Sequence, residues 1–180
     1  MLLVVDNGSV YTKNLVDLLN AKKIKFEKQI PEALNLESIT HYDSFILSGR
    51  RKNEKQTNKV NSKIILHSIK FNKKLLGICY GAEILALTLG GTIRKTNSLQ
   101  GGKEKVTIHT DNPICKKDLE VFESHSFEIS KLPNLLVPIG KSQNCKYEII
   151  QYEKDPIFGT QFHPEMSIDG HKLIEKFCYL

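Results

Sequence analysis

The chain has 180 residues, of which 40% are hydrophobic, and 26 Lys and Arg residues stand against 20 Asp and Glu residues. This length and composition predict one soluble globular domain over residues 1–180. No apolar run reaches membrane-spanning length and the first residues lack a signal-peptide pattern, so we expect a cytoplasmic protein without membrane contacts. The formal charge of +6 comes from scattered lysines without interleaved aromatic residues, which argues against nucleic acid as a partner.

The four cysteines are dispersed along the chain and lie next to no paired histidines. They are Cys79, Cys115, Cys145 and Cys178. Because metal sites and disulfide frameworks show characteristic short spacings, this distribution predicts reduced thiols and no metal.

The first half of the chain alternates between strand and helix patterns. A continuous apolar run over residues 1–5 ends at Asp6-Asn7-Gly8, which is typical of a buried parallel strand and its turn. Further elements are expected as a helix over 11–19, strands over 25–30 and 44–47, and a helix over 60–71. Strands that alternate with helices predict an α/β fold in which helices cover both faces of a mostly parallel sheet.

The second half begins differently. From residue 90 to residue 152 the pattern changes to short β segments at 106–109, 119–122 and 147–152. We therefore expect a small antiparallel β extension before a strand over 157–162 returns to the main sheet. A last helix over 168–177 closes the domain.

Residues 74–87 read as a buried strand that turns sharply at Cys79 into an apolar-faced helix. The small residues Gly77 and Gly81 leave room for a side chain held on a tight, exposed strand-to-helix turn, the nucleophile elbow. The N-terminus of a helix also favours a thiolate over a thiol. The alternative is a buried core cysteine at the end of a strand.

A histidine and a carboxylate follow the strand near residue 160. His163 closes the strand and Glu165 stands two residues later. This order supplies a general base and a group that orients its ring. An isolated histidine is more often structural, but this pair in a chain with a cysteine elbow favours nucleophilic catalysis.

The elbow and the segment Gln161-Phe162-His163-Pro164-Glu165 together resemble the class I glutamine amidotransferase family over essentially the whole chain. The resemblance implies a three-layer, flavodoxin-like fold and a catalytic triad of Cys79, His163 and Glu165. It also implies hydrolysis of glutamine to glutamate through a cysteinyl thioester, with no cofactor, and transfer of the ammonia to a synthetase active site.

The resemblance further implies an oxyanion hole formed by the backbone N–H groups of Gly49 and Tyr80. The chain departs from the family at two nearby positions. Arg50 stands where a second glycine is usual, so a glycine-only backbone conformation is expected to be lost. Glu83 replaces a substrate-contacting glutamine and would disfavour the thiolate. An Arg50–Glu83 ion pair is one hypothesis for this change, and Arg50 pointing into solvent is the other.

Other segments make the resemblance more specific, because they are similar to one branch of the family. Residues 6–12, 77–82, 123–125 and 155–159 are similar to GMP synthetase amidotransferases, in particular the separate archaeal subunit. This implies glutamine as substrate and, on another chain, an ATP-pyrophosphatase synthetase that converts XMP to GMP. Only fifteen residues follow Glu165, in line with that expectation. Residues 125–127 also resemble anthranilate synthase amidotransferases, which implies that backbone groups of Ser126 and Phe127 hold glutamine.

Two other functions stay open. One is a stand-alone cysteine hydrolase of γ-glutamyl bonds. The other is a catalytically weak regulatory subunit, which the residues Arg50 and Glu83 favour.

Overall fold

The computed structural model describes residues 1–153 and 155–180, in which nine strands form one sheet in the order β2-β1-β3-β4-β9-β8-β7-β5-β6. The parallel part consists of β2 (Phe26–Gln29), β1 (Leu2–Val5), β3 (Ser44–Leu47), β4 (Lys74–Ile78) and β9 (Ile157–Thr160). The antiparallel part consists of β8 (Ile149–Tyr152), β7 (Leu136–Lys141), β5 (Thr92–Ile108) and β6 (Leu119–Lys131).

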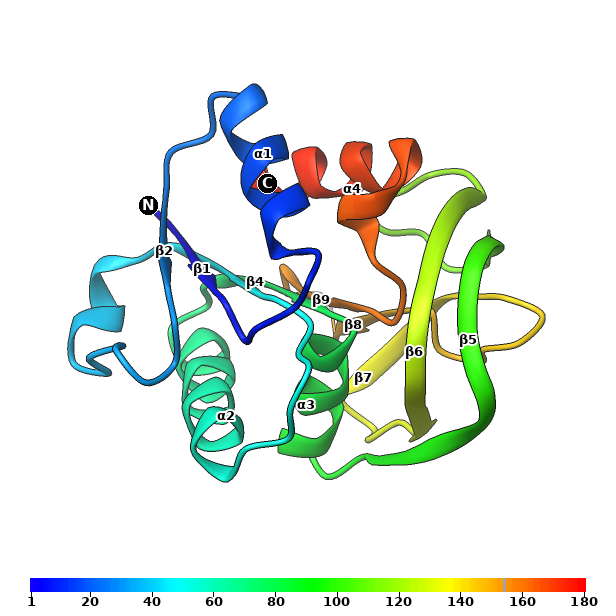
Figure 1. Cartoon of the computed structure of the whole chain (residues 1–180), viewed down its shortest axis with the longest axis horizontal. Coiled ribbons are helices and arrows are strands. Elements are labelled where there is room, and N and C mark those ends of the chain that lie inside the picture. Colours follow the sequence, from blue (N-terminus) through cyan, green and yellow to red (C-terminus); the bar gives the residue numbers. More distant parts are fainter. Residues whose placement is uncertain (154) are drawn as a thin grey trace.

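Helices cover both faces of the sheet (Figure 1). One face carries α1 (Thr12–Ala21) and α4 (Ile168–Cys178), and the other carries α2 (Lys55–Lys70) and α3 (Tyr80–Thr88). Two short 3-10 helices, η1 (Ser38–His41) and η2 (Pro164–Met166), lie in connections. The expected three-layer, flavodoxin-like α/β fold is therefore confirmed.

Two hydrophobic cores explain why the first strand is a continuous apolar run. Leu2 and Val4 belong to the core that α1 and α4 cover. Leu3 and Val5 belong to the core that α2 and α3 cover. A strand that is buried on both faces needs apolar side chains at every position, because successive side chains point to opposite faces.

The predicted extension is a much longer hairpin than expected. The segments predicted at 106–109 and 119–122 are only the adjoining ends of β5 and β6, which run beside each other at one end of the molecule (Figure 1). Most side chains of β5 are exposed or half-buried. A strand with two solvated faces has no apolar alternation, so the sequence pattern underestimates its length.

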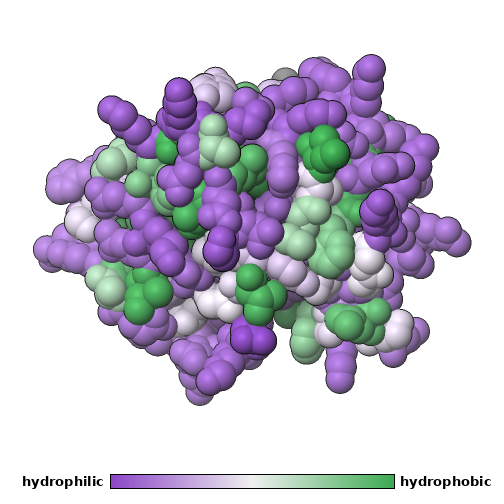
Figure 2. Space-filling model, turned by 45° about the horizontal axis from the view of Figure 1, so that its top comes forward, coloured by the Kyte–Doolittle hydropathy of each residue, from purple (hydrophilic) through white to green (hydrophobic). Residues whose placement is uncertain are grey.

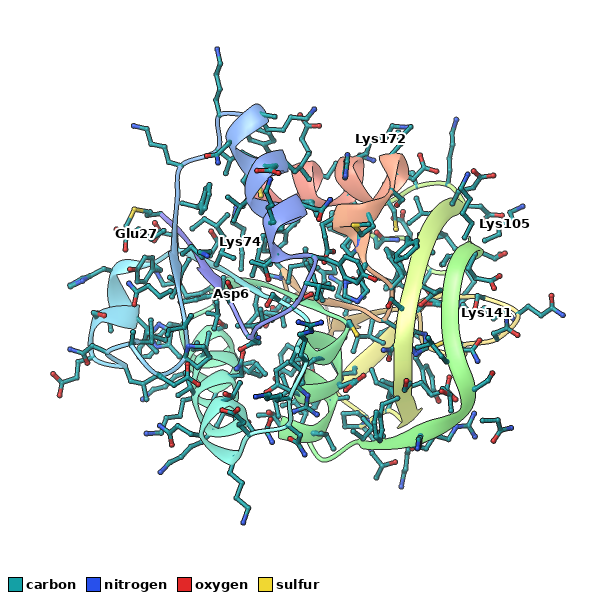
Figure 3. All side chains as sticks on the ribbon, viewed as in Figure 1. Asp6, Glu27, Lys74, Lys105, Lys141 and Lys172 are labelled. Atoms are coloured by element: carbon teal, nitrogen blue, oxygen red, sulfur yellow. The ribbon has the colours of Figure 1, made fainter. Side chains whose placement is uncertain are left out.

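The molecular surface is dominated by polar side chains. On the face shown in Figure 2, the described apolar residues form separate small patches. Lysines project outward from several elements, and Lys105 and Lys172 have side chains 69% and 66% exposed (Figure 3). Among the described residues, no helix is both long and apolar enough to span a membrane.

Two buried carboxylates lie beside the antiparallel part of the sheet. Glu148, just before β8, is fully buried, and Glu123 on β6 is nearly so. Within the described residues, neither oxygen of Glu148 receives a well-aligned hydrogen bond. Burial, and then the charge of Glu123, raise the pKa of Glu148 well above its ordinary value.

The raised pKa of Glu148 makes stability depend on pH. The folded chain keeps a proton on Glu148 that the unfolded chain releases, so stability falls as pH rises above the ordinary glutamate pKa of about 4.3. We expect Glu148→Gln to raise the melting temperature near pH 8 by roughly 2–8 °C, and to change it little near pH 4. Thermal unfolding of both proteins across this range measures the difference. Glu120→Gln, at an exposed position, is the control, and a difference independent of pH would contradict the account.

Candidate active site

Cys79 occupies a strained turn between a strand and a helix. β4 ends at Ile78 and α3 begins at Tyr80, so Cys79 is the single connecting residue. Its backbone has φ +50° and ψ −104°, a region that residues with a side chain rarely adopt. The Cys79 N–H donates to the carbonyl oxygen of Thr160, with N and O 2.7 Å apart. The predicted strand–turn–helix geometry is confirmed.

The two glycines beside Cys79 are needed for packing. A Cβ atom on Gly77 would collide with the backbone of Gly81, and a Cβ atom on Gly81 would collide with the carbonyl oxygen of Leu47 at the end of β3. Only glycine therefore allows the first turn of α3 to lie directly against β3 and β4.

His163 and Glu165 form a buried pair immediately after β9. His163 Nδ1 and Glu165 Oε1 are 2.9 Å apart, and the two residues are 3% and 2% exposed. The backbone N–H of His163 donates to the Phe122 carbonyl, and the ring of Tyr11 packs against the His163 ring with centroids 4.6 Å apart. This arrangement favours the tautomer in which Nδ1–H donates to Glu165 and Nε2 remains a proton acceptor.

Three separate segments meet at the carboxyl edge of the parallel strands. A Cβ atom on Gly49, in the turn after β3, would lie 3.0 Å from His163 Cε1, so this turn touches the imidazole. The hydrogen bond from Cys79 to Thr160 joins the elbow to the end of β9, three residues before His163. Ligands of open α/β sheets bind at this edge.

The thiol of Cys79 is shielded from water. Cys79 is only 9% exposed. Burial, and then the charge of Glu83, raise the pKa of the Cys79 thiol well above its ordinary value, while the Tyr80 backbone N–H acts in the opposite direction. The prediction of an exposed turn residue with a favoured thiolate is therefore wrong for the free chain, because burial outweighs the helix N-terminus.

Comparisons with known proteins identify the family. The family model "Glutamine amidotransferase class-I" matches residues 3–179. The chain belongs to this family. It is 31% identical to a subunit of the glutamine-hydrolyzing GMP synthase of Pyrococcus furiosus, covering 95% of this chain and 92% of that protein. It is 29% identical to the protein of the same name from Methanocaldococcus jannaschii, covering 99% of this chain and 96% of that protein.

A solved structure agrees with this assignment. The crystal structure of a Thermoplasma acidophilum protein, described provisionally as a GMP synthase subunit, superposes with a TM-score of 0.87. The sequences are 26% identical, and the match covers 99% of this chain and 92% of the other. The class I amidotransferase fold therefore extends over nearly the whole chain.

Glu83 is buried and forms a hydrogen bond with Gln161, the first residue of the segment 161–165. Gln161 Nε2 donates to Glu83 Oε1 at 3.4 Å and to the carbonyl oxygen of Phe127 at 3.3 Å. Burial is the main cause that raises the pKa of Glu83, and the hydrogen bond from Gln161 opposes it. The Phe127 carbonyl also lies 2.9 Å from His125 Nδ1. One of the backbone groups at the position predicted to hold glutamine, the Phe127 carbonyl, thus has protein partners in this chain.

Ser126 lies where the β5–β6 hairpin is irregular. Lys95 pairs with Phe127 and Gln100 pairs with His125, so the strand pairing is interrupted opposite Ser126. Regular strand pairing is therefore interrupted at Ser126, and its predicted contact with glutamine stays a prediction.

The hypothesis of an ion pair between Arg50 and Glu83 is wrong. Among the described residues, no salt bridge joins these two side chains. The Arg50 guanidinium instead lies over the ring of Tyr80, 4.0 Å from its centroid. Arg50 does not have a positive φ, so its backbone does not adopt a glycine-only conformation, in line with the expected loss of such a conformation.

Several residues at this site carry no recognisable signal in the sequence. Asn58 on α2 accepts hydrogen bonds from both Arg50 and Tyr80, but it belongs to a helix with no motif. Tyr11 packs on His163 and donates to Ser124, and its only sequence signal is its place in the segment 6–12. In the described part of the chain, no group of three or more His, Cys, Asp or Glu residues is arranged to hold a metal.

Glu83 gives a prediction about the thiol. We expect Glu83→Gln to increase the rate at which iodoacetamide alkylates Cys79 by about 3- to 10-fold near pH 8, because a negative charge that disfavours the thiolate is removed. The gain should shrink at lower pH, where Glu83 in the parent chain is protonated. Mass spectrometry of the Cys79 peptide measures the rate, with Glu54→Gln at an exposed position as the control. An equal rate in parent and variant at every pH would contradict the role assigned to the Glu83 charge.

Proposed function

We propose that this chain is the glutamine-hydrolysing subunit of a GMP synthase, and that Cys79, His163 and Glu165 carry the reaction within one domain over residues 1–180. The observation that carries the proposal is the strained Cys79 elbow at the same sheet edge as the buried His163–Glu165 pair. The names of the relatives, each a subunit of GMP synthase, supply the acceptor reaction.

The first half of the reaction forms a thioester. The Cys79 sulfur attacks the side-chain carboxamide carbon of glutamine while His163 Nε2 takes the thiol proton. The carbonyl electrons move onto oxygen, and the backbone N–H groups of Gly49 and Tyr80 stabilise this oxyanion. When the C–N bond breaks, His163 returns the proton to nitrogen, so ammonia leaves and a glutamyl thioester remains.

The second half hydrolyses the thioester. Water attacks the thioester carbon and His163 takes a water proton. Collapse of the second tetrahedral intermediate breaks the C–S bond, and the proton returns to sulfur, which releases glutamate. Glu165 orients the imidazole and stabilises its protonated form in both halves, without taking the proton itself.

We also propose that a synthetase on a separate chain receives the ammonia. Ammonia released into neutral water becomes ammonium, which is not a nucleophile, so the product is useful only beside an acceptor site. The relatives are named as one subunit of their enzyme, which supports a second subunit here. The raised pKa of Cys79 supports low activity of the free chain and activation by the partner. The acceptor reaction would be the ATP-dependent amination of XMP to GMP.

Glutamine labelled with ¹⁵N at the side-chain amide tests this function. The labelled substrate is given to the chain alone, and to the chain with the synthetase subunit of the same organism, ATP and XMP. We expect slow release of glutamate by the chain alone, faster release in the mixture, and ¹⁵N in GMP. Glutamate release without label in GMP would favour a stand-alone hydrolase. No release in either sample would favour a regulatory subunit.

A further inference from the structure

Arg50 joins three elements at the edge of the candidate site. Its Nη1 donates to Asn53 Oδ1 and to Asn58 Oδ1, both at 2.8 Å, and its guanidinium lies over the Tyr80 ring. The Tyr80 hydroxyl donates to the same Asn58 oxygen at 2.8 Å. We call these four residues the Arg50 cluster. It connects the turn after β3, the start of α2 and the first residue of α3.

The contacts of Arg50 are those of a planar group rather than of a simple charge. Its partners are two amide oxygens and an aromatic face, all of them neutral. A guanidinium presents several donors in one plane and can lie flat on an aromatic ring, whereas a lysine ammonium is a compact point charge that can approach a ring but has no plane of donors. Tyr80 itself is 2% exposed, so Arg50 lies over a ring that is buried in the core.

The two proposed oxyanion donors lie on the two elements that this cluster connects. Tyr80 begins α3, and Gly49 immediately precedes Arg50. On its other side the same turn is held by Asn7, whose Nδ2 donates to the carbonyl oxygen of Ser48 at 2.9 Å. Arg50 therefore provides a side-chain contact between the turn and the residue that carries the second donor.

The distance between two oxyanion donors affects the transition state more than substrate binding. The donors must match the oxygen of the tetrahedral intermediate, and that geometry does not exist in bound glutamine. A displacement of about 1 Å in such a site can cost on the order of 10²-fold in rate.

We propose that Arg50 is a positioning residue, which fixes the Gly49 turn against Tyr80 and so sets the spacing of the oxyanion donors. This inference rests on the proposed glutaminase function. In this chain the Arg50 cluster takes the part that a compact glycine-containing turn has in the family pattern.

Three variants test the role of Arg50. We expect Arg50→Ala to lower kcat for glutamine hydrolysis by about 10- to 100-fold and to change KM by less than about 3-fold. Arg50→Lys should lose nearly as much, because it keeps the charge but not the plane. Arg51→Ala removes the same charge from the next, exposed position and should leave kcat unchanged. All are assayed in the complex with the synthetase, with melting temperatures as a check on folding.

Alkylation of Cys79 by iodoacetamide is the second readout. This substitution needs no oxyanion hole, so we expect its rate in Arg50→Ala to stay within about 2-fold of the parent. Asn58→Ala removes the shared acceptor and should lower kcat in the same way, which keeps the inference testable if the Arg50 variants fold poorly.

Several results would overturn the inference. Full activity of Arg50→Lys would show that only the charge matters, and equal losses in Arg50→Ala and Arg51→Ala would show a general effect of loop charge. A parallel fall of alkylation and kcat would mean that Arg50 acts on the thiol. None of these three results would contradict the proposed function, provided that glutamine hydrolysis by the parent chain depends on Cys79. A parent without such turnover, even with the synthetase, would overturn both.

Discussion

We expect Cys79→Ala to lower kcat for glutamine hydrolysis by about 10⁴-fold or more, because no other group in the proposed mechanism can form the thioester. Cys79 is mostly buried, so the variant should also lose roughly 1–2 kcal/mol of unfolding free energy. The positive φ adds nothing to this loss, because alanine keeps the Cβ atom that strains the backbone. Glutamate formation in the complex with the synthetase measures the activity, and thermal unfolding measures the stability.

A second cysteine variant serves as the matched control. Cys115 is also a buried free cysteine, but it lies against Asn112, away from the sheet edge. Cys115→Ala should therefore cost stability without a comparable loss of kcat. Retained hydrolysis by Cys79→Ala would overturn the assignment of the nucleophile.

The second large effect is expected at His163. His163→Ala should lower kcat by about 10³- to 10⁴-fold, because both halves of the reaction pass a proton through Nε2. Glu165→Gln should lower kcat by less, about 10- to 100-fold. Glu165 only orients and stabilises the imidazole, whose Nδ1 lies 2.9 Å from Glu165 Oε1. Steady-state kinetics of the three proteins measure both values.

Combining changes shows whether Cys79 and His163 act as one unit. The double variant Cys79→Ala with His163→Ala should be about as inactive as either single variant, because removing one partner already removes the activated nucleophile. A double variant much worse than both single variants would mean that each residue contributes independently, which the proposed mechanism does not allow.

The sequence predicted the buried parallel strands because their pattern reflects burial. β1 and β3 are buried at every position, and that condition requires an apolar residue at nearly all of them. The elbow was predictable for a similar reason: only glycine at positions 77 and 81 lets α3 approach β3 and β4 closely. The length of β5 was not predictable, since its solvated side chains leave no apolar pattern.

The details of the site depend on contacts between elements distant in sequence. Arg50 turns toward Tyr80 because Asn53 and Asn58 accept hydrogen bonds there. No motif in the sequence predicts this role for Asn58. The sequence predicts a thiolate at Cys79 because the position of a residue at a helix N-terminus is visible locally. Burial, which raises the pKa of the thiol, is set by the whole fold and is not visible there.

A glutamine analogue that carries an electrophilic ketone in place of the carboxamide tests the central claim most directly. The analogue is incubated with the complex, and mass spectrometry locates the adduct among Cys79, Cys115, Cys145 and Cys178. We predict one adduct, on Cys79, with excess glutamine preventing its formation and with none in His163→Ala over the same time. Equal labelling of all four cysteines, or labelling of the partly exposed Cys178 ahead of Cys79, would contradict the account.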